Sequence, residues 1–205
     1  MITYRAASKN DLNTIAKVHT DCFKEYFLTS LGNHLLAKYY GEYINEGGPF
    51  ILAVSDVDGI IGFCMGYQTG SRARANFEKN NKFQLLFKLL YLCLLCNKSA
   101  WDRVLSKIKS SFGAFIHKKN NSVSKNKKSP EGTILSVCVV EKYRGTDVSK
   151  TLISKFEDEL RTRKIEKCTL SVHTTNSRAR AFYEKVGFNI QKESADCVVY
   201  VKTID

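Results

Sequence analysis

The central part of the chain, residues 132–188, alternates apolar runs with polar breaks. The uncharged, β-branched run at 134–140 predicts a buried strand. A break at 143–147 follows, and the next apolar residues recur at helical spacing. The pattern predicts a strand, a tight turn, a long helix, a strand and a short helix. The turn opens into a helix N-terminus, where unpaired N–H groups and the helix dipole favour an anionic ligand.

The flanking regions complete an α/β pattern. Residues 2–6 predict a first strand, and two helices with inward-facing apolar stripes follow it. A hairpin signal at 56–59 joins strands at 50–54 and 60–67, and two strands close the chain at 189–191 and 197–201. The predicted order is β-α-α-β-β-insertion-β-α-β-α-β-β. We expect one domain over 1–205 that contains an insertion at 71–130.

The insertion has a pattern of its own. Residues 83–96 are apolar on nearly all sides, and 101–116 carry apolar residues on one helical face. The first stretch is too short for a membrane span, which needs about 20 residues. Residues 83–116 could form a helical lid, a dimer contact or a peripheral contact with an anionic membrane. The lysine-rich stretch 118–129 is expected to be a loop.

Charge is concentrated in the same insertion. Residues 71–130 hold 14 of the 32 Lys and Arg but 2 of the 20 Asp and Glu, so the remainder of the chain is neutral. The net charge of +12 therefore describes one segment and not the central unit. No recognition motif for nucleic acid accompanies the segment, so we expect no nucleic-acid partner.

The seven cysteines are scattered through apolar strands and helices, which favours reduced core thiols. Cys93 and Cys96 form a single CxxC flanked by leucines. Without a second pair, the sequence predicts no metal site. No apolar leader precedes the first strand, and we expect a cytoplasmic protein.

Two separated motifs resemble the GNAT acetyltransferase superfamily. Residues 139–145, VVEKYRG, are similar to its strand and pyrophosphate loop, and 176–188, NSRARAFYEKVGF, match its Asn-x-x-Ala-x-x-x-Tyr-x-x-x-Gly-Phe signature. The chain has Asp147-Val148-Ser149 where the family usually has Gly-x-Gly or Gly-x-Ala. The resemblance implies the GNAT fold, a mixed and mostly antiparallel sheet flanked by helices, here with a basic helical insertion.

The resemblance also implies acetyl-CoA as cosubstrate and assigns its binding residues. The central strand would pair with the pantetheine arm, and an N–H near Val139 would stabilise the oxyanion. The loop would present amides to the pyrophosphate, with Asp147 turned aside as a helix cap. Asn176 would bond the pantetheine arm or cap the last helix. The expected cofactor-binding residues are Val137, Cys138, Val139, Arg144, Gly145, Thr146, Asp147, Val148, Ser149, Lys150 and Asn176.

Tyr183 is the expected general acid, which protonates the departing CoA thiolate. Its helical spacing with Ala179, Phe182 and Val186 would also suit a core position. No general base is identified. In relatives that acetylate ribosomal-protein N-termini a glutamate stands where this chain has Ser171, and His173 at the end of that strand could relay a proton.

The resemblance implies an N-acetyltransferase that acts on a primary amine of a small molecule. The motif FLTSLG and the basic insertion are similar to a subgroup found with polysaccharide and cell-surface sugar biosynthesis, which hints at an amino sugar. Two alternatives remain open: a protein or peptide N-acetyltransferase, and a non-catalytic acyl-CoA-binding module with a degenerate pyrophosphate loop.

Overall fold

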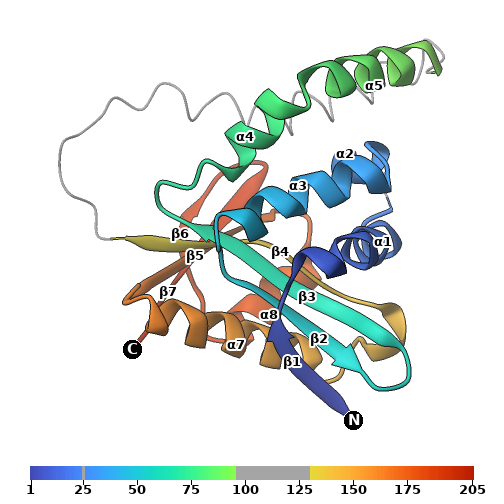
Figure 1. The fold of residues 1–205 in the computed structure, drawn as a ribbon. Helices are drawn as coiled ribbons and strands as arrows, with labels where there is room; N and C mark the ends of the chain where they lie inside the picture. Colours follow the sequence, from blue (N-terminus) through green and yellow to red (C-terminus); the bar gives the residue numbers. More distant parts are fainter. Residues whose placement is uncertain (25, 96–129) are drawn as a thin grey trace.

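A computed structural model describes residues 1–24, 26–95 and 130–205. The described strands form one seven-stranded sheet in the order β1-β2-β3-β4-β5-β7-β6, and β4 with β5 is its parallel pair (Figure 1). The strands are β1 Ile2–Ala6, β2 Phe50–Ser55, β3 Gly59–Gln68, β4 Glu131–Val139, β5 Lys167–His173, β6 Asn189–Glu193 and β7 Cys197–Thr203.

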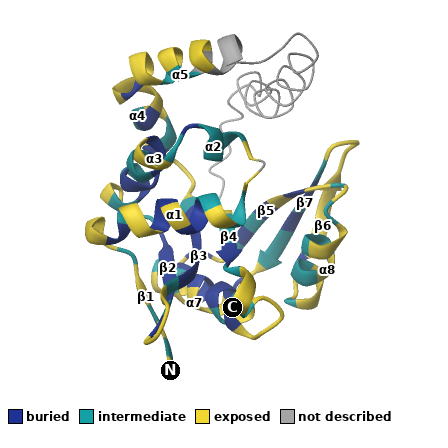
Figure 2. Cartoon of the chain, turned by 90° about the vertical axis from the view of Figure 1, so that its right-hand side faces the viewer, coloured by how far each residue is buried: buried dark blue, intermediate teal, exposed yellow. Residues whose placement is uncertain are grey.

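Helices cover both faces of the sheet. Residues of α1, α3 and α4 pack with one set of strand side chains, while α7 and α8 pack with the other set. The dark core in Figure 2 lies between these layers. The helices are α1 Leu12–Cys22, α2 Phe27–Ser30, α3 Asn33–Asn45, α4 Ala73–Asn80, α5 Lys82–Leu95, α7 Val148–Thr162 and α8 Ser177–Lys185, with 3₁₀ turns at Lys9–Asp11 and Glu141–Tyr143.

The strand β4 is irregular at Leu135, which is an extra residue relative to β3. The register with β3 shifts where Ser136 pairs with Met65 and Ile134 pairs with Gly66. Glycine is required at position 66, because an added Cβ would lie 2.1 Å from the carbonyl oxygen of Thr133. Such a bulge bends the strand that carries it. Pairing of β4 with β5 stops at Ile134, next to the bulge, so the two strands separate beyond that point.

The predicted α/β fold, with a mixed sheet flanked by helices, is confirmed. The element order agrees with the prediction, and α5 extends over Lys82–Leu95, close to the predicted stretch. The sequence pattern did not reveal α4, because its apolar residues are few. The predicted second helix at 101–116, the loop at 118–129 and Cys96 lie outside the described residues. No helix in the described ranges is long and apolar enough to cross a membrane.

Candidate active site

The opening between β4 and β5 is the feature that organises the site. The two strands pair in parallel only from Glu131–Ile134 to Lys167–Leu170. Beyond this, β4 continues to Val139 beside β3, and β5 continues to His173 beside β7. Each strand therefore has one edge without a strand partner along the opening. Such an edge can pair with an extended ligand through backbone hydrogen bonds.

The backbone groups of Val137 and Val139 point into this opening. The N–H of Val140 donates to the carbonyl of Ile61 on β3, at 2.8 Å. Because successive residues of a strand alternate in the direction of their hydrogen-bonding groups, those of Val139 and Val137 face away from β3. Of the three strand residues predicted to bind cofactor, Cys138 instead turns its backbone towards β3. Its side chain is buried on the α1 side.

The turn after β4 presents a row of free amides. Gly145 has a φ of 81°, a left-handed conformation that favours glycine. The amides on either side of the row, those of Arg144 and Thr151, already bond to backbone carbonyls. Those of Gly145, Thr146, Asp147, Ser149 and Lys150 make no hydrogen bond in the described part of the chain. Since these amides precede and begin α7, they form an anion site at a helix N-terminus.

Arg144 joins the turn to the strand. Its Nε donates to the carbonyl oxygen of Val139, at 3.1 Å, and its side chain is exposed. This bond places a guanidinium at the mouth of the opening, next to the free N–H of Val139. A positive charge there favours a negatively charged ligand.

Asp147 stands at the N-cap of α7, but its side chain makes no capping hydrogen bond. The prediction that this carboxylate caps the helix is therefore wrong. Its carbonyl accepts from the amide of Thr151 at 2.8 Å and from its hydroxyl at 3.0 Å. The backbone of Asp147 is in the ordinary helical region, with φ −72°, so no glycine is needed there. The exposed carboxylate remains near the anion site and opposes a phosphate electrostatically.

Tyr183 lies on α8, with its ring packed against Phe182, Phe188 and Tyr200. The side chain is half-buried, and its hydroxyl makes no hydrogen bond within the described residues. Among the described residues, His19 Nε2 is the one fully buried polar side-chain atom without a hydrogen-bond partner, so the unbonded hydroxyl of Tyr183 is not fully buried. The phenol therefore reaches accessible space. Its pKa is raised, mainly by burial, so the hydroxyl stays protonated at neutral pH.

Packing places the phenol on the same face of the sheet as part of the opening's strand. The side chains of Tyr183 and Val137 pack against the core cluster that contains Val139 and the buried side of α7. Cys138 belongs to the cluster on the opposite face. Tyr183 and the side chains of Val137 and Val139 therefore share one side of the sheet.

Asn176 is the N-cap of α8. Its Oδ1 accepts from the amide of Ala179 at 3.1 Å. Its side-chain NH₂ makes no hydrogen bond among the described residues, so it can still donate to a ligand. Of the two roles that the sequence left open, the capping role is present.

Cys138, predicted as a cofactor-binding strand residue, lies next to Cys22 on the α1 face, and this proximity was not predicted from the sequence. Cys22 ends α1 and lies beside Cys138 and Arg144, whose side chains lower the pKa of its thiol to about 7, Cys138 having the larger effect. Both thiols are free, as are those of Cys64, Cys168 and Cys197. The sequence suggested only core packing, since nothing in a helical pattern shows which residue meets the opposite strand.

Two histidines differ in their surroundings. His19 is 3% exposed, and its Nδ1 lies 2.6 Å from the hydroxyl of Tyr40. Burial lowers the pKa of His19 to about 4, so the ring is neutral at pH 7. His173 is exposed at the end of β5, with Nδ1 3.1 Å from Thr175 Oγ1. No group of three or more His, Cys, Asp and Glu suited to a metal occurs in the described ranges.

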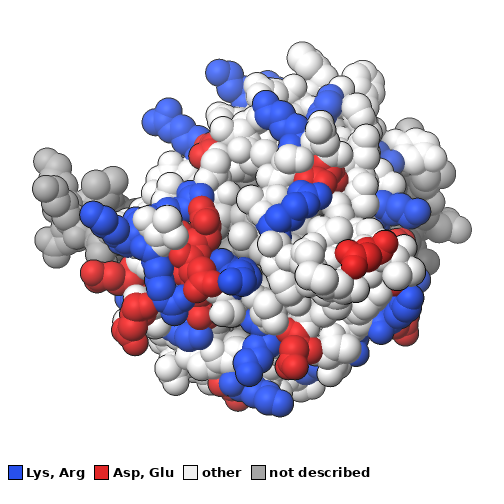
Figure 3. Space-filling view, turned by 60° about the horizontal axis from the view of Figure 1, so that its bottom comes forward, with Lys and Arg blue, Asp and Glu red and all other residues white. Residues whose placement is uncertain are grey.

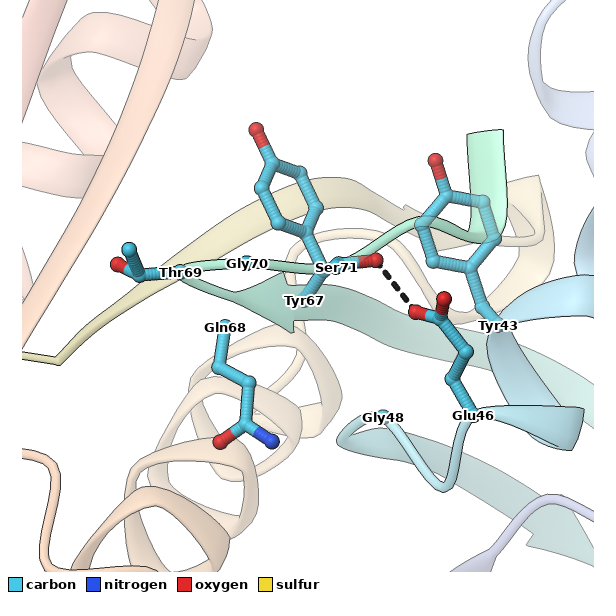
Figure 4. Close-up of a pocket in the computed structure, with 8 residues that line it drawn as sticks. All are labelled: Tyr43, Glu46, Gly48, Tyr67, Gln68, Thr69, Gly70 and Ser71. Atoms are coloured by element: carbon cyan, nitrogen blue, oxygen red, sulfur yellow. Dashed lines mark hydrogen bonds between the residues drawn. The ribbon is translucent and has the colours of Figure 1, made fainter. Parts of the chain in front are cut away.

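A small cavity lies elsewhere on the molecule. Its volume is about 240 Å³, and Tyr43, Glu46, Tyr67 and Gln68 contribute to its lining (Figure 4). Gln68 pairs with Gly132, at the end of the sheet where β4 and β5 are still joined. The carboxylate of Glu46 is already bonded to the hydroxyl of Ser71, at 2.5 Å. The cavity is therefore separate from the opening between the strands.

Part of the chain matches a known family model. Residues 112–188 match the model of the acetyltransferase (GNAT) family, a stretch whose first part, 112–129, lies outside the described residues. No curated protein matches the chain.

Solved structures share the fold at low sequence identity. A PaiA N-acetyltransferase from Thermoplasma acidophilum in complex with coenzyme A has a TM-score of 0.60 and 16% identity, covering 99% of each chain. The ribosomal-protein-S18-alanine N-acetyltransferase from Escherichia coli has a TM-score of 0.58 and 13% identity, covering 100% of this chain and 95% of that one. Arabidopsis thaliana Naa50 in complex with a bisubstrate analogue has a TM-score of 0.57 and 17% identity, covering 98% of this chain and 97% of that one.

The separated parallel strands, the amide-rich turn and the phenol lie on a fold that this chain shares with N-acetyltransferases of known structure. More particularly, the seven-stranded fold is that of the GNAT acetyltransferases, and the stretch over 112–188 carries their family pattern.

Proposed function

We propose that this protein is an acetyl-CoA-dependent N-acetyltransferase that acetylates a primary amine of a small molecule. The row of free amides after Arg144, which begins α7, is the observation that carries the proposal. Five amides, a helix N-terminus and a guanidinium suit the diphosphate of CoA better than a single phosphate or carboxylate. The PaiA structure, which has this fold, contains coenzyme A.

The adjacent strand suits the rest of the cosubstrate. The pantetheine arm carries amide groups. The backbone groups of Val137 and the N–H of Val139 can pair with them as a further strand would. Asn176 can donate from its free side-chain NH₂. An arm that follows β4 from the turn brings the thioester towards the phenol of Tyr183.

The chain's own residues then support acetyl transfer in a ternary complex. The nitrogen of the acceptor forms a bond to the thioester carbon, and the N–H of Val139 stabilises the negative charge on the carbonyl oxygen. The carbon–sulfur bond breaks, and Tyr183 donates its proton to the departing thiolate. The acceptor nitrogen loses a proton to water. Because burial raises the pKa of Tyr183, the phenol holds a proton to donate at neutral pH.

The acceptor is proposed to be a small amine, and an amino sugar is the favoured example. In β5 this chain has Ser171 at the position where relatives that acetylate ribosomal-protein N-termini have a glutamate, so their carboxylate is missing here. A peptide N-terminus is the second candidate, because neighbours of the same fold include Naa50 with a peptide-bearing analogue and the NatC complex bound to Gag peptide. We place the reaction in the cytoplasm and propose no nucleic-acid partner.

A non-catalytic acyl-CoA-binding module is the third candidate, and Asp147 is the residue that supports it. An exposed carboxylate beside the anion site weakens diphosphate binding without blocking it, since the backbone of the turn is unstrained at Asp147. Bound CoA with no turnover of any amine would favour this reading.

The experiment is release of the CoA thiol from acetyl-CoA with a panel of amino sugars, polyamines and peptides. The proposal predicts acceptor-dependent release with at least one small amine, and loss of that release in Tyr183→Phe. Release only with peptides would establish the second candidate. Absence of release with every amine, together with calorimetric binding of CoA, would establish the third.

A further inference from the structure

The helix α5 carries an apolar stripe that the described domain leaves uncovered. The helix projects from the body of the molecule beyond α4 (Figures 1 and 2). Its exposed apolar side chains are Phe83 at 73%, Leu86 at 52%, Phe87 at 69%, Leu90 at 52% and Tyr91 at 54%. These account for five of the ten exposed large hydrophobic residues in the described chain, so the exposure is local.

The stripe occupies one side of the helix. At about 100° per residue, the five side chains span roughly 140° of its circumference. Leu85 lies on the opposite side of the helix and packs against the core cluster to which α3 and α4 contribute. A hydrogen bond of 3.1 Å from Lys38 Nζ to Gln84 Oε1 ties the start of the helix to α3. The domain therefore holds α5 by its inner side and presents the stripe outwards.

Positive charge borders the stripe on both margins. Lys82 and Lys88 lie at either edge of the apolar arc on the helical wheel. The ammonium of Lys88 lies 5.4 Å from the ring centroid of Tyr91. In the described part of the insertion, 71–95, Glu78 is the one acidic residue, and it is paired with Arg74.

The surface around α7 does not share this pattern. Acidic and basic residues pair along α7, as Lys155 does with Asp158, and at its C-cap, where Arg163 pairs with Glu159. Figure 3 shows both signs of charge interspersed on the face seen from below. The combination of apolar side chains bordered by lysines is therefore a local feature of α5, and the mixed charges around α7 do not repeat it.

We propose that the α5 stripe docks on an anionic lipid surface. Apolar and aromatic side chains between lysines match the boundary of acyl chains and negatively charged headgroups. A second copy of the chain fits less well, because it would bring the same lysines together. Five partly exposed side chains of ~100–250 Å² each also offer roughly 500–600 Å², less than the ~800 Å² that one partner of a standard interface buries.

The proposal is independent of the acetyltransferase reaction. Its test is flotation of the full chain with phosphatidylcholine vesicles that contain phosphatidylserine, and with vesicles of phosphatidylcholine alone. We expect binding to the anionic vesicles that falls at least tenfold at high salt, since exposed charges are screened. Binding to neutral vesicles is expected to be at least tenfold weaker.

Variants separate the stripe from the rest of the surface. Leu86→Glu with Phe87→Glu is expected to reduce vesicle binding at least tenfold, and Lys82→Gln with Lys88→Gln severalfold. Val57→Glu changes a residue that is 84% exposed on the β2–β3 turn, and this matched control should bind as the wild type does. Melting temperature and CoA affinity should stay unchanged in each variant, because the side chains are exposed or, at Lys88, half-buried, and lie on α5 and the β2–β3 turn instead of at the opening.

Three results would overturn the proposal. Equal vesicle binding by the stripe variant and the wild type would show that the stripe is not the contact. A wild-type dimer in analytical ultracentrifugation that the stripe variant dissociates would identify a second copy as the occupant. A melting temperature lowered by several degrees in the stripe variant, with no vesicle binding by the wild type, would show that the chain itself covers the stripe.

Discussion

Replacing Tyr183 by phenylalanine removes one hydroxyl and leaves the packing of its ring. The contacts with Phe182, Phe188 and Tyr200 belong to the ring and are retained. The hydroxyl has no hydrogen-bond partner within the described residues, so its loss leaves no buried group unsatisfied. The free energy of unfolding is expected to change by less than about 0.5 kcal/mol.

The effect on turnover is expected to be large. A positioned general acid contributes roughly 10²–10⁴-fold to a rate. A hundredfold loss of kcat corresponds to about 2.7 kcal/mol of barrier. CoA affinity should remain within about twofold, because the diphosphate and the arm are held by backbone groups that the substitution does not touch.

Tyr200→Phe is the matched control. The hydroxyl of Tyr200 donates to Glu184 at 2.7 Å, on the same side of the sheet as Tyr183. Its removal should lower stability by about 1 kcal/mol and leave kcat unchanged. The assay is thiol release at saturating acetyl-CoA and amine, with calorimetry for CoA binding. An unaltered kcat in Tyr183→Phe, or an equal loss in Tyr200→Phe, would refute the role of Tyr183 as general acid.

The remaining predictions concern the turn, an ion pair and a thiol. Asp147→Gly should tighten CoA binding severalfold in calorimetry, because it removes a carboxylate that repels the diphosphate. It should lower the free energy of unfolding by about 0.5 kcal/mol, since the carboxylate interacts favourably with the dipole at the N-terminus of α7. Unchanged affinity would contradict repulsion of the diphosphate. Gly145→Ala should cost about 1 kcal/mol in urea unfolding, because φ is 81°, and should weaken CoA binding; unaltered stability and affinity would be contrary evidence. Arg5 donates two hydrogen bonds to the carboxylate of Asp11, at 2.7 Å and 2.8 Å, and holds its pKa well below the usual value of about 3.9. The pair therefore stabilises the fold fully above about pH 4. This stabilisation is lost as the pH falls through the lowered pKa. Asp11→Asn should therefore lower stability at pH 7 by about 2 kcal/mol and flatten its acid dependence; an equally steep acid dependence would exclude the pair. Cys22, whose pKa lies near 7, should be alkylated by iodoacetamide at pH 7 faster than Cys64, Cys138, Cys168 and Cys197, and mass spectrometry that finds it unreactive would contradict the assignment.

Hydrophobic pattern was sufficient for most of the fold. The uncharged run at 134–140 predicted a buried strand, and β4 ends at Val139. The spacing of Leu152 and Phe156 predicted the buried side of α7, and both are fully buried. These elements were predictable because burial on one or two faces leaves a period of 2 or 3.6 in the sequence.

The site required information that a linear pattern does not carry. The bulge at Leu135 separates β4 from β5, but its sequence looks like the rest of an apolar strand. The meeting of Cys22 with Cys138 depends on how α1 crosses the sheet. The side-chain direction of Asp147 depends on a turn in which another residue, Gly145, takes the left-handed conformation. Each is a tertiary feature, and none changes the local periodicity.

Acetyl transfer by this protein requires that a diphosphate bind the free amides after Arg144 while the attached arm follows Val137 and Val139. Isotopically labelled protein, titrated with CoA and followed through its amide resonances, would reveal this binding residue by residue. Large shifts are expected at 145–150 and at Val137 and Val139, with none at Tyr43 and Gln68 beside the separate cavity. Shifts confined to the cavity, or no shifts at saturating CoA, would show that CoA does not bind at this turn.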